Sequence, residues 1–246
     1  MFPTLQIGPA TLPTSGLIIL IGIWIGLSLA ERYSDRFQVS PSHINNLVFL
    51  SLVSGLLGAR LGYILQHTHA FISNPVSVVS RNVELLDPFF GIFCVIIAGV
   101  IYIQKKKLSL LSILDALVPM MAILLIAISL SDLASGSAYG KPSRLPWAIE
   151  LWGTTRHPSQ IYMLILSSGI LWIFWPGKPK WVSRQPGIYF YCFLSSAVSM
   201  IIFLEAFQGD SVLLPEGIHQ NQVLAWLLLA FSLFAVRNIQ SRQVQA

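Results

Sequence analysis

Long apolar runs alternate with short polar segments along the whole chain. A helix needs about 20 apolar residues to cross a hydrocarbon layer of roughly 30 Å, and seven runs approach or exceed that length. These runs cover residues 15–30, 44–65, 87–104, 111–131, 159–175, 187–207 and 220–236. The pattern predicts an all-α, polytopic membrane protein, built as a bundle of about seven transmembrane helices.

The composition agrees with this prediction. Of the 246 residues, 54% are hydrophobic and only 10% are charged, a balance that a soluble domain of this size could not hide in its core. No repeat or linker divides the chain, so we expect one transmembrane domain over residues 1–246. The two cysteines, Cys94 and Cys192, lie inside apolar runs and form no Cys–His cluster, so we expect no metal site and no cofactor.

The positive charges predict the orientation of the bundle. The net charge is +5, but the basic residues fall in short loops between apolar runs, which points to membrane topology and away from a nucleic-acid partner. One side carries Arg32, Arg36, Lys105, Lys106, Lys107, Lys178, Lys180, Arg184, Arg237 and Arg242, and the other carries Arg81, Lys141, Arg144 and Arg156. Because the richer side normally faces the cytoplasm, we expect the C-terminus in the cytoplasm and the N-terminus outside.

The second apolar run contains an arginine among glycines, in "GLLGARLGYIL". Gly55, Gly58 and Gly62 follow the small-residue spacing that lets two helix backbones approach closely in lipid. Arg60 lies between them, where a bare charge costs about 3 kcal/mol on insertion scales. Two interpretations are open: a snorkelling or ion-paired side chain, with Asp115 or Glu205 as partner, and a clamp for phosphate oxygens.

Two acids lie within or near the apolar runs. Asp115 follows the lysines at 105–107 closely, which favours a capping or loop-pairing role near the cytoplasmic end. Glu205 lies near the outer end of the sixth run, and we expect a structural role for it, with Arg60 or Arg156 as a possible cation partner.

The stretch "TTRHPSQIY" places polar donors directly before the fifth run. Proline is favoured at the first position of a helix, so His157 is expected to cap the helix, Pro158 to begin it, and Gln160 to turn back toward the exposed N–H groups. The requirements of a helix start do not explain why Arg156 and His157 stand together at this position. A helix N-terminus flanked by an arginine and a histidine can bind an anion, and at this depth the available anion is a phospholipid headgroup.

Several motifs, taken in order, resemble the prolipoprotein diacylglyceryl transferase family. They are "GARLGYIL", "YGKPSRLPWAIE", "RHPSQIY", "IFLEAFQGD" and "QNQVLA", and the likeness covers nearly the whole chain. "RHPSQIY" is fairly specific, whereas "GARLGY" alone would be weak. The family's seven spans, with the N-terminus outside and the C-terminus inside, match the predicted topology.

The resemblance implies a function and a location. Members of the family move the diacylglyceryl group of phosphatidylglycerol onto the thiol of a lipobox cysteine and release glycerol phosphate. It thus implies a multi-pass protein of the bacterial plasma membrane, with phosphatidylglycerol or another anionic phospholipid and a lipoprotein signal peptide as partners. Arg60, Lys141, Arg144 and Arg156 are the candidates for binding the lipid phosphate, and His157 is the candidate catalytic base.

The chain departs from the family at reactive positions. The family's His-Gly-Gly motif is reduced here to Gly91, with Phe89 at the position of the histidine. The other substituted positions are Ser129 and Ile201 for two arginines, Asp132 and Ser135 for two asparagines, Ser137 for a glutamate and Ser15 for a tyrosine. Gly140 keeps its place in the family pattern. Losing one preorganised donor costs roughly 100- to 1000-fold in rate, so several losses threaten transfer.

Two interpretations follow for the function. The chain is either a divergent transferase that holds the lipid phosphate with Arg60 and Arg156, or a catalytically degenerate relative that binds anionic lipid or signal peptide without transfer. A small transporter would call for inverted repeats or helices broken in mid-span, and the sequence shows neither.

Overall fold

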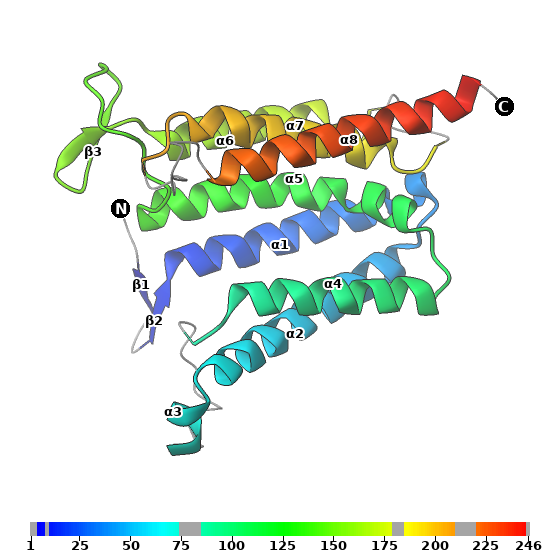
Figure 1. The fold of residues 1–246 in the computed structure, drawn as a ribbon, viewed down its shortest axis with the longest axis horizontal. Coiled ribbons are helices and arrows are strands. Elements are labelled where there is room, and N and C mark those ends of the chain that lie inside the picture. The colour runs from blue at the N-terminus through cyan, green and yellow to red at the C-terminus, as the bar shows by residue number, and fades with distance from the viewer. Residues whose placement is uncertain (1–3, 8–9, 74–84, 179–184, 210–219, 245–246) are drawn as a thin grey trace.

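The computed structural model describes residues 4–7, 10–73, 85–178, 185–209 and 220–244. Figure 1 shows long helices laid beside one another, with the two termini at opposite ends. The seven principal helices are α1 (Thr14–Tyr33), α2 (Pro41–Gln66), α4 (Pro88–Lys105), α5 (Leu110–Ser135), α6 (Ser159–Ile173), α7 (Ile188–Glu205) and α8 (Gln220–Val244). They confirm the predicted all-α, polytopic class. The helix α8 continues to Val244, beyond the apolar run, because hydropathy marks only the lipid-covered part of a helix.

Six of these helices are long and apolar enough to cross a membrane, and the helix α6, with 15 residues, is shorter. The remaining described elements are small: η1 (Ser34–Phe37), α3 (Thr68–Ser73) and four short strands. Three residues of the charge count, Arg81, Lys180 and Arg184, lie outside the described residues.

The strands form two antiparallel hairpins at one end of the bundle (Figure 1). Strand β1 (Thr4–Ile7) pairs with β2 (Ala10–Pro13), and β3 (Ile149–Leu151) pairs with β4 (Thr154–Arg156). We call this the hairpin end; it is the end that the charge distribution predicts to face outside.

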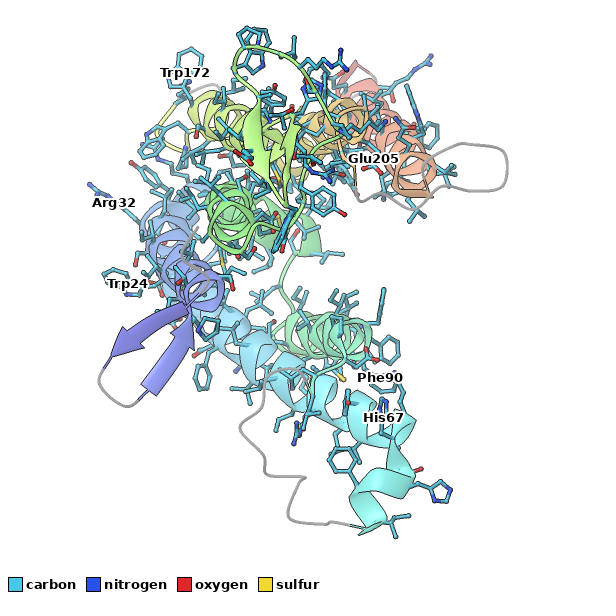
Figure 2. All side chains as sticks on the ribbon, turned by 90° about the vertical axis from the view of Figure 1, so that its left-hand side faces the viewer. Trp24, Arg32, His67, Phe90, Trp172 and Glu205 are labelled. Carbon is cyan, nitrogen blue, oxygen red and sulfur yellow. The ribbon has the colours of Figure 1, made fainter. Side chains whose placement is uncertain are left out.

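The glycines of α2 make the close helix contact that their spacing predicts. A Cβ atom on Gly58 would lie 2.4 Å from Sγ of Cys94, and one on Gly62 would lie 2.3 Å from Cβ of Phe90. Helix α2 therefore packs directly on α4 through a face that tolerates no side chain. In Figures 1 and 2 this α2–α4 pair lies to one side of the other helices, and α3 lies farther out still.

The core lies between α1, α5, α6 and α7, and the first turns of α2 also contribute to it. Helix α1 meets α5 at Gly22, where an added Cβ would come within 2.4 Å of Cβ of Ala127. Fully or nearly fully buried members of the core include Ala30, Ile44, Ile113, Ala116, Phe174, Tyr189 and Phe193. Small residues let the helix backbones approach closely, and the aromatic ring of Phe174 packs against those of Tyr189 and Phe193.

Asp115 caps the start of α7 at the end opposite the hairpins. Its two carboxylate oxygens accept hydrogen bonds from the backbone N–H groups of Gly187, at 2.6 Å, and Phe190, at 2.7 Å. Only 3% of its surface is exposed. The expected capping role of Asp115 is thus confirmed, although the helix that it caps is a distant one.

Candidate functional site

The segment between α5 and α6 folds into a small sheet at the hairpin end. Strands β3 and β4 are joined by a tight turn in which Trp152 and Gly153 both have positive φ, 54° and 72°. The preceding stretch adds a third line of pairing, because the Ser143 N–H donates to Thr155 O at 2.9 Å and the His157 N–H donates to Lys141 O at 3.0 Å. Strand β4 is therefore flanked on both sides, which fixes the residues just before α6.

Gly140 joins this sheet to the end of α7. The backbone N–H of Lys141 donates to Phe207 O at 2.8 Å, and Gly140 forms an isolated bridge with Gln208. A Cβ on Gly140 would lie 2.3 Å from the carbonyl oxygen of His157. Only a glycine fits between these two backbones, which gives Gly140 the structural role expected of it.

Helix α6 begins one residue later than the sequence predicts. Pro158 is the N-cap residue, and its carbonyl accepts the N–H groups of Ile161 and Tyr162 at 3.0 and 3.1 Å, so the prediction that His157 caps the helix was wrong by one position. The expectation for Gln160 was also wrong. Its Nε2 donates to Ser137 O at 2.7 Å, and among the described residues no side chain makes a cap hydrogen bond to the N–H groups at the start of α6.

Arg156 braces the sheet from within. Its Nε donates to Leu151 O and its Nη1 to Gly140 O, both at 3.3 Å, and its guanidinium lies over the ring of Tyr139, 4.7 Å from the centroid. A planar fork suits two carbonyls that come from different segments, one in β3 and the other in the stretch before it. Two of the N–H groups of Arg156 that were expected to bind a lipid phosphate are therefore bonded to backbone carbonyls.

We expect Arg156→Lys to loosen the sheet. An ammonium group lacks the fixed fork that reaches both carbonyls, so the variant should lose about 1 kcal/mol of stability. The change should appear as faster backbone hydrogen exchange over residues 141–157. Exchange identical to that of the unsubstituted protein would contradict a bracing role.

His157 lies in an aromatic cluster. Its Nδ1 is 3.4 Å from Oη of Tyr162, and its ring centroid is 5.4 Å from that of Phe207. Tyr162 Oη in turn accepts a hydrogen bond from Nε1 of Trp147 at 2.8 Å. The chain of Trp147, Tyr162 and His157 orients the imidazole at the start of α6, where a base could act on a group arriving from the membrane.

Arg60 lies in a different neighbourhood from Arg156. Its Nη1 donates to Leu85 O at 3.0 Å, and its guanidinium lies 5.8 Å from the ring centroid of Phe71 in α3. Figure 2 shows Phe90 and His67, at this end of the α2–α4 pair, well away from Glu205 and the β3–β4 hairpin. The two arginines therefore do not form one clamp in this conformation.

The start of α4 is fastened beside Arg60. Asp87 is the N-cap of α4; its carboxylate accepts the Phe90 N–H at 2.9 Å, and its own N–H donates to Ala59 O at 2.9 Å. The hydrogen bond from Phe90 holds the pKa of Asp87 below its ordinary value.

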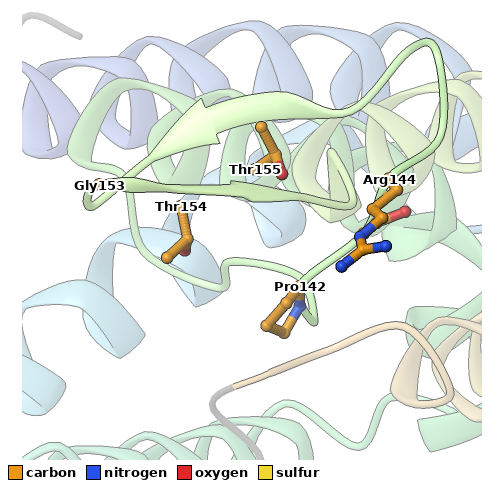
Figure 3. A pocket seen from close by; sticks show the side chains of 6 residues that line it. Pro142, Arg144, Gly153, Thr154 and Thr155 are labelled. Carbon is orange, nitrogen blue, oxygen red and sulfur yellow. The ribbon is translucent and has the colours of Figure 1, made fainter.

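Arg144 faces a polar pocket that could not be predicted from the sequence (Figure 3). The pocket has a volume of about 490 Å³ and is lined by Pro142, Ser143, Arg144, Gly153, Thr154 and Thr155. The backbone of Lys141 is fixed by its hydrogen bonds to Phe207 and His157, and its side chain is half-buried. The hydroxyl residues become neighbours of Arg144 through strand pairing, which has no local signal in the sequence.

Comparison with known proteins places the chain in a family. The family model described as prolipoprotein diacylglyceryl transferase matches residues 3–237. The chain belongs to the prolipoprotein diacylglyceryl transferase family. This result confirms the resemblance found in the sequence, and it agrees with the membrane-spanning helices.

Curated relatives carry the name phosphatidylglycerol–prolipoprotein diacylglyceryl transferase. One from Bordetella parapertussis is 29% identical over 191 residues, covering 74% of this chain and 71% of the relative. One from Pseudomonas putida is 30% identical over 198 residues, covering 75% and 74%. One from Rickettsia bellii is 23% identical over 251 residues, covering 97% and 95%. These relatives support a prolipoprotein diacylglyceryl transferase-like function.

Ser129, one of the positions at which the sequence was expected to depart from the family, faces the interior of the bundle. Its hydroxyl donates to Leu125 O at 2.8 Å and lies 3.5 Å from Oγ of Ser167, and both serines are fully buried. Phe89, another of these positions, is 84% exposed. Glu205 is buried near the hairpin end.

Proposed function

We propose that this chain is a plasma-membrane member of the diacylglyceryl transferase family that binds anionic phospholipid at its hairpin end without transferring the diacylglyceryl group. Residues 1–246 form one domain, with the hairpin end outside and the C-terminus in the cytoplasm. Phosphatidylglycerol is the favoured lipid, because the curated relatives are named for it.

One observation carries the proposal: the hydrogen-bond donors of Arg156 and Ser129 are already bonded to backbone carbonyls. Arg156 donates to the carbonyls of Leu151 and Gly140, and the Ser129 hydroxyl donates to a carbonyl of its own helix. Transfer needs preorganised cations where charge develops on the leaving phosphate, and each missing donor costs roughly 100- to 1000-fold. Groups already held by backbone carbonyls are poorly placed to replace them.

Lipid binding makes smaller demands than transfer. It needs an accessible cation near the headgroup layer and an apolar surface for the acyl chains. Arg144 is exposed at the hairpin end, and the helices below it expose apolar side chains over most of their length.

The test is a transfer assay with the purified protein, phosphatidylglycerol and a lipobox peptide, read by mass spectrometry of the peptide. The Pseudomonas putida relative serves as the active control. We expect an unmodified peptide from this chain, together with phosphatidylglycerol bound to the protein in native mass spectrometry. A peptide that gains a diacylglyceryl group would overturn the proposal.

A second candidate function is transfer by a rebuilt site around His157. The observation in its favour is the aromatic chain that orients the imidazole. In that reaction the peptide sulfur would bond to the glyceryl carbon, the carbon–oxygen bond to phosphate would break, and His157 would take the thiol proton while glycerol phosphate leaves. A modified peptide that disappears with His157→Asn would support this second function.

A further inference from the structure

The pocket beneath the β3–β4 hairpin has the chemistry of a phosphate site. Figure 3 shows Arg144 on one side of it and Thr154 and Thr155 along the strand that forms another. Ser143 adds a third hydroxyl residue to the lining. A guanidinium donates to phosphate oxygens through a planar pair of N–H groups, and the hydroxyls of Ser143 and Thr155 can donate to the oxygens that remain. The Thr154 hydroxyl donates to Leu151 O at 3.5 Å and so adds only an acceptor to the lining.

The surroundings of the pocket favour a negatively charged ligand. Lys141 and Arg156 belong to the same small sheet as Arg144, and Glu150, on β3, is opposite Thr155 in the strand register. The sheet thus carries three cations and one acid. A phosphate bearing a single charge is attracted under these conditions, and the attraction is screened by salt.

The rim of the pocket points to a lipid as the source of the phosphate. On the same segment, Leu145, Trp147 and Trp152 are 38%, 58% and 68% exposed. Both indole N–H groups donate hydrogen bonds within the protein: that of Trp147 to Tyr162 Oη at 2.8 Å, and that of Trp152 to Gly136 O at 3.2 Å. Tryptophans with a fixed polar edge and an exposed ring are typical of the layer between water and hydrocarbon.

We infer that the pocket lined by Ser143, Arg144, Thr154 and Thr155 binds the phosphate of a phospholipid in the leaflet at the hairpin end, with Trp147 and Trp152 lying among the headgroups around it. The inference rests on the proposed lipid-binding function and gives it a location apart from Arg156 and His157. Lipid recognition in this chain is thereby assigned to a surface sheet.

The experiment measures binding of dioctanoyl-phosphatidylglycerol to the full-length protein in a nonionic detergent by microscale thermophoresis. The variant is Arg144→Gln, and the matched control is Arg237→Gln, an exposed arginine on α8. Removing one charged donor pair should raise Kd about tenfold for Arg144→Gln and leave it unchanged for Arg237→Gln. Glu150→Gln should change Kd in the opposite direction, because it removes the acid of the sheet.

Three results would overturn the inference, and they are distinguishable. If the protein binds the lipid and Arg144→Gln binds it equally well, the headgroup lies elsewhere while the proposed function stands. If the unsubstituted protein binds no phosphatidylglycerol, the inference and the proposed function both fail. If glycerol 1-phosphate competes as strongly as the lipid itself, the pocket takes soluble phosphate esters. Unchanged thermal unfolding of Arg144→Gln shows that a loss of binding is not a loss of fold.

Discussion

Replacing Asp115 by alanine should lower the free energy of unfolding by about 3 kcal/mol. The carboxylate accepts two short backbone hydrogen bonds at the start of α7, and it is nearly fully buried. Alanine would leave the N–H groups of Gly187 and Phe190 without acceptors in a place that water reaches poorly. Thermal unfolding in detergent, followed by circular dichroism, measures the loss.

Two further variants separate capping from a general effect of charge. Asp115→Asn keeps one acceptor oxygen and should lose about half as much stability as alanine does. Asp35→Asn changes an exposed acid at the same end of the bundle and should leave the melting temperature unchanged. If Asp115→Ala has the same melting temperature as the unsubstituted protein, the Asp115 carboxylate does not stabilise the fold by capping α7.

Gly140→Ala should destabilise the junction between the small sheet and α7 by about 3 kcal/mol. The new methyl group would lie 2.3 Å from the carbonyl oxygen of His157 and 2.9 Å from its carbonyl carbon, so two backbone segments would have to separate. Limited proteolysis should then cut within residues 141–157, and phosphatidylglycerol binding should fall together with the sheet.

The control for this variant is Gly169→Ala in α6. A Cβ at Gly169 would meet nothing within 4 Å, so alanine should be neutral there or stabilise the helix by up to about 1 kcal/mol. If Gly140→Ala resists proteolysis as well as Gly169→Ala does, the close approach at Gly140 does not hold the sheet.

The transmembrane helices could be predicted from the sequence because each one is a continuous signal. An apolar run of sufficient length has few alternatives in lipid, so the helices were expected within a few residues of their observed ends, except that α8 continues eight residues beyond the predicted end at 236. A close helix contact at Gly58 and Gly62 was likewise predicted from their spacing, but the sequence did not show that α4 is the partner helix. Asp115 was expected to cap a helix or to pair with a loop because it closely follows the lysines at 105–107, near the end of a span.

The surface sheet could not be predicted in the same way. Strands β3 and β4 have three residues each, and their turn uses Trp152 and Gly153 in place of the common Asn-Gly pair. The role of Arg156 was missed for a related reason. Its acceptors, Leu151 O and Gly140 O, are backbone atoms, and only the folded sheet brings them to the guanidinium.

The shortness of α6 has a consequence for the bilayer itself. At about 1.5 Å per residue its 15 residues extend roughly 22 Å, less than the roughly 30 Å of a hydrocarbon layer. Such a hydrophobic mismatch is relieved by local thinning of the membrane around the helix. We therefore expect the bilayer to be thinner beside α6. Lipid headgroups there should lie deeper than in the surrounding membrane, at the level of Ser159 and the polar residues before it.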